Sequence, residues 1–363
     1  MSSRLLETLA IDAQAAKSPE CWSRAICRSA IHLARQGSHA DAQFLITRVR
    51  TAYGKELHID VAAWVMLAEG VLHFSKAEMF QAYDRIRRGY GLAVALQTET
   101  ARPTCAAWMA FLEFNGSKFD EMFTHLHEAL TDAPKDDHGA RGRACGVVAD
   151  AYQVAGRYDC ARAWYERTRL HATAEGDQAT LSAMLYNVAV FRTANLRLAD
   201  AFGGLKSADV LRATMEANSS LGYDYVVGKS TFVSLGPMMY GQLLAIEKNF
   251  VDATKLLDTI IEKNLQPPEL TLLLCERAWC YTQLGRMEDA VLVLRRATSG
   301  LSILQDNDDI AFGHARLAAV ADLCGEINTA EIFRITAYEA LAAHQKFQLT
   351  LLDRLELLTN ALA

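Results

Sequence analysis

One short pattern occurs twice in this chain and limits what it can fold into. GRYDCARAWYERTRL begins at Gly156, and GRMEDAVLVLRRATS begins at Gly285. Each copy has an alanine five residues after the glycine and an apolar residue four residues further on. Before each glycine, apolar residues recur at helical offsets, which place them on one stripe of a helix. Because a glycine can take the positive φ that a helix end favours, each copy predicts two helices joined by a sharp turn.

The same template fits, with varying strength, along nearly the whole chain. Units begin near residues 23, 62, 103, 142, 182, 234, 271 and 311, so most spacings are about 40 residues. A fixed period of this length is typical of stacked helical repeats. Small residues on both helices of a unit, such as Ala149 and Ala161, let the helices approach closely, while larger side chains fill the space between neighbours.

The best copies resemble the tetratricopeptide repeat (TPR). The resemblance rests on Ala149, Tyr152, Gly156, Ala161 and Tyr165, and on the LYNVA stretch at 185–189. A period of about 40 rather than the usual 34 residues is similar to the extended repeats of bacterial sensor and transcription-regulator solenoids. No helix-turn-helix segment is evident at either end, so the resemblance is to the sensor half. It implies an all-α fold, a right-handed superhelical solenoid of about eight antiparallel helical hairpins.

We expect residues 1–363 to form a single solenoid domain. Residues 1–22 are expected to be an N-terminal capping helix, residues 23–340 the hairpin repeats, and residues 341–363 a C-terminal capping helix. Terminal repeats need such caps because an apolar face otherwise meets water. A homodimer contact is the alternative role for the C-terminal helix.

The period is interrupted once, at residues 216–236. The spacing between units is longest there, and Tyr223, Tyr225 and Phe232 crowd a glycine-containing stretch. The favoured interpretation is a long helix or an inter-unit loop packed on its neighbours. The alternative is an irregular insertion that binds a partner, since long loops in compact arrays are often functional.

Composition excludes several classes of partner. The formal net charge is −6 and the basic residues are scattered in pairs, so we expect no nucleic-acid binding by the chain itself. The longest apolar run, VAAWVMLA at 61–68, is far shorter than the roughly 20 residues that span a bilayer, so we expect no membrane insertion. None of the eight cysteines forms a CxxC pair, and the N-terminus lacks the apolar core of a signal peptide. These features predict a reduced, cytoplasmic protein, which the resemblance suggests is bacterial.

No motif in the sequence carries an identifiable chemistry. GYDYVVGKS at 222–230 has five residues between its glycines, whereas a phosphate-binding P-loop needs four and follows a strand. HEALT at 127–131 lacks the second histidine of a zinc-protease helix, and no G-x-S-x-G elbow occurs. We therefore expect no catalytic residues, no metal and no cofactor.

In proteins that the chain resembles, partners lie along the concave face formed by the first helix of each hairpin. Matching position to position, the expected partner-binding residues are Arg24, Arg35, Arg143, Asp150, Gln153, Tyr186, Asn187, Thr193, Met238, Gln242, Trp279, Thr282 and Gln283. Each is alternatively an ordinary solvated side chain, and Asn187 alternatively bonds a neighbouring helix. Gly146 and Asp150 stand where chaperone-tail clamps have lysine and asparagine, so that kind of clamp is not expected.

The repeat array and the lack of a catalytic pattern together predict a non-catalytic scaffold or adaptor. It would bind a protein or peptide in the groove, as the sensing part of a regulatory system. A sensor of a small molecule or signal peptide is the first alternative. An enzyme with a site in the groove is the second, because catalytic residues need only meet in space.

Overall fold

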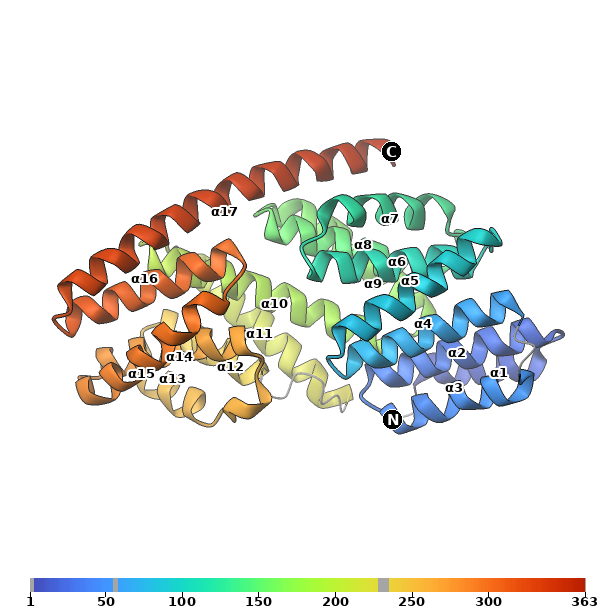
Figure 1. Ribbon diagram of the computed structural model, residues 1–363, viewed down its shortest axis with the longest axis horizontal. Helices are drawn as coiled ribbons and strands as arrows, with labels where there is room; N and C mark the ends of the chain where they lie inside the picture. Colours follow the sequence, from blue (N-terminus) through green and yellow to red (C-terminus); the bar gives the residue numbers. More distant parts are fainter. Residues whose placement is uncertain (1–2, 55–57, 228–234, 363) are drawn as a thin grey trace. The chain divides into compact units, whose positions relative to one another are not determined.

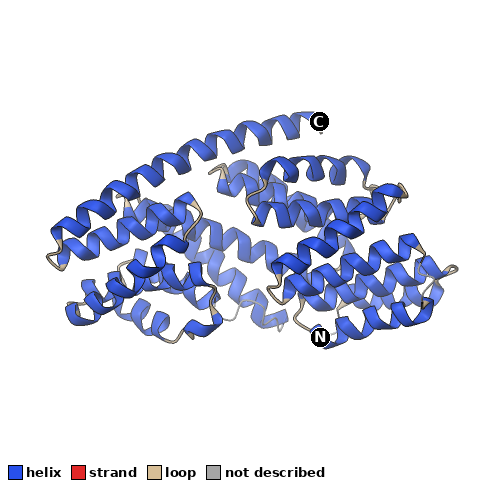
Figure 2. Ribbon diagram, viewed as in Figure 1, coloured by secondary structure: helices blue, strands red, loops and turns tan. Residues whose placement is uncertain are grey.

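The computed structural model describes residues 3–54, 58–227 and 235–362, and within them every regular element is a helix (Figures 1 and 2). The described residues form seventeen α-helices and two short 3-10 helices, with no strand. The all-α fold expected from the repeat is confirmed. Phe232 lies outside the described residues.

After α1 (Arg4–Ala15), the helices follow one another as eight hairpins. The first four are α2 (Pro19–Arg35) with α3 (His39–Tyr53), α4 (Ile59–Ser75) with α5 (Met79–Ala95), α6 (Ala101–Asn115) with α7 (Phe119–Asp132), and α8 (His138–Val154) with α9 (Tyr158–Glu175). The last four are α10 (Gln178–Ala201) with α11 (Ser207–Val227), α12 (Leu235–Ile246) with α13 (Phe250–Asp258), α14 (Pro267–Gln283) with α15 (Met287–Gly300), and α16 (Asn307–Leu323) with α17 (Ile327–Ala361). The 3-10 helices are η1 (Glu262–Asn264) and η2 (Leu301–Ile303).

The chain divides into two compact units. Unit 1 comprises residues 1–184, 223–231 and 351–363, and unit 2 comprises residues 185–222 and 232–350. In unit 1 the first helices α2, α4, α6 and α8 pack in succession, each also against the second helix of its own hairpin. In unit 2, α12, α14 and α16 stack in the same way. The single domain over 1–363 and the hand of the superhelix stay predictions.

The repeated Gly-Arg pair closes two of these hairpins in the same manner. Gly156 has a φ of 73°, as does Gly285. In the first, the Arg157 N–H donates to the carbonyl of Tyr152, and in the second the Arg286 N–H donates to the carbonyl of Tyr281, each over 2.9 Å. This is the Schellman pattern of hydrogen bonds at a helix C-terminus, so the shared sequence encodes a turn.

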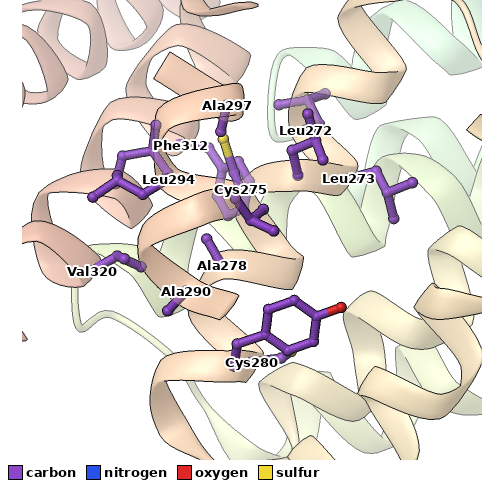
Figure 3. Packing of buried hydrophobic residues seen from close by; sticks show 14 of the residues in the cluster. Leu272, Leu273, Cys275, Ala278, Cys280, Ala290, Leu294, Ala297, Phe312 and Val320 are labelled. Atoms are coloured by element: carbon purple, nitrogen blue, oxygen red, sulfur yellow. The ribbon is translucent and has the colours of Figure 1, made fainter. Parts of the chain in front are cut away.

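The core of unit 2 shows how the repeat positions pack. Leu273, Cys275 and Ala278 of α14 and Ala290 of α15 belong to one cluster, and none of the four has exposed surface (Figure 3). Phe312 of α16 belongs to the same cluster. In unit 1, buried side chains of α2 to α6 form an equivalent cluster. The alanines therefore occupy the close helix–helix contacts that their spacing predicts.

Two boundaries differ from the sequence expectation, and the described part of 216–236 agrees with the favoured interpretation. The first hairpin begins at Pro19 rather than 23, because the Ser18 side chain caps α2 and a proline is favoured in the first turn. Residues 341–361 continue α17 without a break, since no glycine or proline interrupts 327–361, and their role as a cap stays a prediction. Residues 216–227 are the second half of α11, and α12 begins at Leu235, so the part of 216–236 that the structure describes is helical.

Candidate binding site on the first-helix face of unit 1

A small polar pocket lies on the face of unit 1 formed by its first helices. Its volume is about 50 Å³. The side chains that line it come from α1, from all four first helices and from the turn between α9 and α10: Leu5; Arg28, Ile31, His32 and Arg35; Trp64; Thr104 and Trp108; Gly139 and Arg143; Glu175 and Asp177. We call these residues the unit 1 pocket. Because residues from all four hairpins meet here, the pocket is a product of the repeat stacking.

Helix α2 places three basic or polar side chains on one face. Arg28, His32 and Arg35 are separated by four and three residues, which is the spacing of neighbours along a helix surface. Arg28 forms an ion pair with Glu175, and Arg35 Nη1 lies 2.7 Å from Asp177 Oδ2. His32 Nδ1 lies 3.4 Å from Asp177 Oδ1. These contacts join α2 to the turn between α9 and α10.

The carboxylate of Glu175, the last residue of α9, and that of Asp177, in the following turn, sit in different electrostatic environments. Burial alone would raise the pKa of the Asp177 carboxyl, but Arg35 and His32 outweigh it and hold that pKa well below its usual range. Asp177 also accepts a hydrogen bond from the Thr180 N–H at the start of α10. Burial raises the pKa of the Glu175 carboxyl, and Arg28 only partly opposes the rise. Asp177 is therefore the firmly ionised member of the pair.

Arg143 differs from the other two guanidinium groups of the pocket. Its Cζ lies 3.4 Å from the centroid of the Trp108 ring and 5.5 Å from that of Phe111. It forms no hydrogen bond or ion pair with any of the described residues. Burial, aided by the positive charge of Arg35, lowers the pKa of Arg143 well below its usual range. A planar guanidinium stacked on an indole keeps its N–H edge free for a ligand.

A second donor of the pocket also has no acceptor. Trp64 of α4 is 2% exposed, and its buried Nε1 has no hydrogen-bond partner within the described part of the chain. The indole N–H can only donate. A buried donor without an acceptor costs free energy unless water or a ligand supplies one. The unit 1 pocket therefore offers unused donors.

The residues predicted for unit 1 are only partly brought together. Arg35 and Arg143 line the pocket, whereas Arg24 lies half-buried on α2 outside its lining. Asp150 is buried and accepts a hydrogen bond of 2.5 Å from the Tyr165 hydroxyl. Gln153 is also buried. Asp150 thus joins the two helices of its hairpin, and a partner contact there stays a prediction.

Most residues predicted for unit 2 are buried among helices. The buried ones are Tyr186, Thr193, Met238, Gln242 and Thr282. The hydroxyls of Thr193 and Thr282 donate to the carbonyls four residues earlier in their own helices. Asn187 and Trp279 are half-buried, and Gln283 is exposed. Of this set, Trp279 and Gln283 present the most accessible side chains at the end of α14.

The tyrosines of the predicted insertion lie on α11. Tyr223 is half-buried, and burial raises the pKa of its hydroxyl. Tyr225 is 89% exposed. Both are helical residues, and whether they contact a partner stays a prediction.

Sequence analysis did not select Arg28, His32, Trp64, Trp108 or Asp177. The α2 residues share a stripe with Arg35, so extending that stripe by one turn would have found them. The tryptophans were indistinguishable from core residues. Asp177 lies in a turn, and a turn residue is placed in space only by tertiary packing.

A second buried charge cluster occupies the first helices of unit 2. The Nη2 atom of Arg316 lies 2.6 Å from Asp200 Oδ2, and that of Arg197 lies 2.8 Å from Asp309 Oδ1. Glu276 has no exposed surface, and its Oε2 lies 3.5 Å from Arg316 Nε. Burial raises the pKa of the Glu276 carboxyl. These pairs link α10, α14 and α16 through buried charges.

Two searches of the described residues bear on the type of site. No group of three histidine, cysteine, aspartate or glutamate side chains is arranged to hold a metal ion there. None of the helices in the same ranges is long and apolar enough to cross a membrane.

Comparison with solved structures gives the architecture. The structure of the apo form of RapI matches this chain with a TM-score of 0.50 over 90% of this chain and 87% of that one. The fold is a TPR-like α-solenoid. Sequence identity in the match is 11%, so the likeness concerns the fold alone. Comparison of the sequence with protein-family models and with curated proteins finds no match.

Proposed function

We propose that this chain is a non-catalytic scaffold or adaptor that binds a segment of a protein or peptide on the first-helix face of unit 1, as part of a regulatory system. The observation that carries the proposal is the unit 1 pocket, which residues from four successive hairpins line and in which Trp64 and Arg143 present donors without acceptors. Helical solenoids use such extended faces to bind partners. The likeness to RapI supports the scaffold but identifies no partner.

The size of the pocket favours an extended ligand over a compact one. Sites for small molecules usually have volumes of about 300 to 1,000 Å³, whereas the unit 1 pocket has about 50 Å³. A cavity of this size holds one terminal group or side chain, so the rest of the ligand must lie outside it. This is the geometry expected of a peptide anchored at one point.

Site-specific photo-crosslinking in native lysate tests the proposal. The crosslinking amino acid replaces Arg24, half-buried on α2, or in the control replaces Arg162, exposed on α9. We expect a discrete adduct from position 24 that is absent from position 162. Equal adducts at both positions, or none at position 24, would contradict the proposal.

The alternative, a sensor of a small molecule, is separated by thermal melting. A ligand that binds only the folded protein raises its melting temperature. If the low-molecular-mass filtrate of the lysate raises the melting temperature after protease treatment, the ligand is a small molecule and not a peptide. We expect protease treatment to abolish the shift. Robust turnover in a broad panel of hydrolase substrates would contradict the non-catalytic assignment.

A further inference from the structure

We propose that the unit 1 pocket binds a carboxylate of the ligand, and that Arg143 is the residue that pairs with it. This inference rests on the proposed function, because it names the chemical group that the binding face takes.

The lining residues contain one more cation than they can pair. Arg28 is matched by Glu175 and Arg35 by Asp177. Arg143 is half-buried and has no carboxylate partner among the described residues. A partly buried charge without a partner loses hydration that nothing replaces, so an anion of single negative charge completes this pocket.

The unused donors fit the same kind of group. Arg143 has a planar fork of N–H groups, which matches the two oxygens of a carboxylate. The contact of its Cζ with the Trp108 ring helps to hold the fork in place. Trp64 adds a buried N–H that has no acceptor in the described chain. Arg143 and Trp64 can only donate hydrogen bonds, so both require oxygen acceptors from the ligand.

Size and charge favour a carboxylate over a phosphate. A phosphate monoester carries about −1.5 to −2 charges at neutral pH, which is more negative charge than the single unpaired cation can neutralise. Glu175 and Asp177 line the same cavity and would repel the excess negative charge. A volume of about 50 Å³ holds a carboxylate with few further atoms. The carboxylate of a peptide comes either from its C-terminus or from an acidic side chain.

Indole N–H resonances of tryptophan-labelled protein report binding directly. The chain has five tryptophans, and single substitutions to phenylalanine assign their signals. Four probes are titrated: N-acetyl-Ala-Ala, the same dipeptide as its C-terminal amide, N-acetyl-Ala-Asp-Ala amide, and inorganic phosphate. We expect saturable shifts at Trp64 and Trp108 with a carboxylate-bearing peptide, with a Kd on the order of 1 mM, and none with the uncharged amide.

The four probes distinguish the two sources of the carboxylate. Shifts with N-acetyl-Ala-Ala alone identify a C-terminal carboxylate, and shifts with the aspartyl peptide identify an acidic side chain. Equal shifts with the uncharged amide, shifts with phosphate alone, or no saturable shift with any probe would overturn the proposal.

Matched variants locate the pairing cation. Arg143→Gln is expected to weaken carboxylate binding about tenfold or more, whereas Arg162→Gln, exposed on α9, is expected to leave it unchanged. Arg143→Lys keeps the charge but loses the fork, and an intermediate loss is expected. Melting temperatures of the variants verify folding. Unchanged affinity in folded Arg143→Gln protein contradicts the role of Arg143.

The two proposals fail differently. If no probe binds but crosslinking at position 24 still yields a discrete adduct, the binding face stands and the carboxylate subsite is wrong. If the carboxylate peptide binds but no partner crosslinks, the subsite stands and the scaffold function is wrong.

Discussion

The guanidinium Cζ of Arg143 lies over the indole of Trp108, 3.4 Å from the ring centroid. The two residues come from adjacent first helices, α8 and α6. Their contact therefore depends on the stacking of one hairpin on the next and orients a cation that no acidic residue of the described chain pairs with. The same stacking brings Arg35 of α2 to Asp177.

Replacing Asp177 with asparagine is expected to destabilise the protein at neutral pH. An amide still caps α10, but Arg35 loses its ionic partner, at a cost of about 3 kcal/mol in the free energy of unfolding. Urea unfolding of wild type and Asp177→Asn measures the difference.

The sign of the pH dependence follows from the lowered pKa of Asp177. Its contribution to stability is present above the ordinary aspartate range, about 3.9, and is lost as the pH falls through the lower pKa of the folded state. The gap between wild type and variant should shrink in acid. A gap independent of pH would show that the ion pair is not its cause.

Asp309 in unit 2 is expected to behave in the opposite way. Burial raises the pKa of its carboxyl to about 6, although Arg197 opposes the rise. The carboxyl therefore contributes stability that is present below its ordinary pKa of about 3.9 and is lost as the pH rises to about 6. Urea unfolding of Asp309→Asn across this range should give a flatter stability profile than wild type. An unchanged slope would assign the titration to another group.

The hairpin turns predict two substitutions of opposite sign. Gly285→Ala should cost about 1 kcal/mol, because φ is positive and no heavy atom lies within 4 Å of an added Cβ, so only backbone strain is introduced. Lys248 occupies the matching turn between α12 and α13 with a φ of 63°. Lys248→Gly should be neutral or stabilising by up to about 1 kcal/mol, because it relieves the same strain. Denaturant midpoints compare them, and equal destabilisation in both would contradict this account of the turns.

The core of unit 2 should depend strongly on Phe312. Its ring is 1% exposed and lies below the guanidinium of Arg197, 4.1 Å from Cζ. Phe312→Ala should lower the free energy of unfolding by about 3 to 5 kcal/mol through a cavity and a lost cation–π contact. Tyr225→Ala, at an exposed position, is the control and should change it by less than about 0.5 kcal/mol. Similar losses in both variants would contradict the assignment of the core.

The sequence predicted the architecture well because its signals are local. Ala149, Gly156 and Ala161 act within one hairpin, and a period of about 40 residues repeats their spacing. The binding site was harder to predict because it is assembled across hairpins. Arg35 and Arg143 were selected from their helical positions, but nothing local distinguishes an arginine paired by an acidic residue from one that is left unpaired.

Buried polar residues account for the other positions at which the predicted binding site differs from the structure. Asp150 and Thr193 occupy groove positions by register, yet Asp150 accepts a hydrogen bond from Tyr165 and Thr193 bonds its own helix. Sequence spacing places a side chain on a face but does not reveal whether a neighbour covers it. The continuous α17 differs from the expectation for another reason. The repeat period suggested a separate helix there, whereas helix propensity favours no break.

The most direct test of the binding face is the affinity of the crosslinked partner segment for matched arginine variants. Once the segment is identified by mass spectrometry, isothermal titration compares wild type, Arg143→Gln in the unit 1 pocket and Arg162→Gln on α9. The account predicts that Arg143→Gln binds at least about tenfold more weakly and that Arg162→Gln binds as wild type does. Equal affinity for all three folded proteins would contradict it.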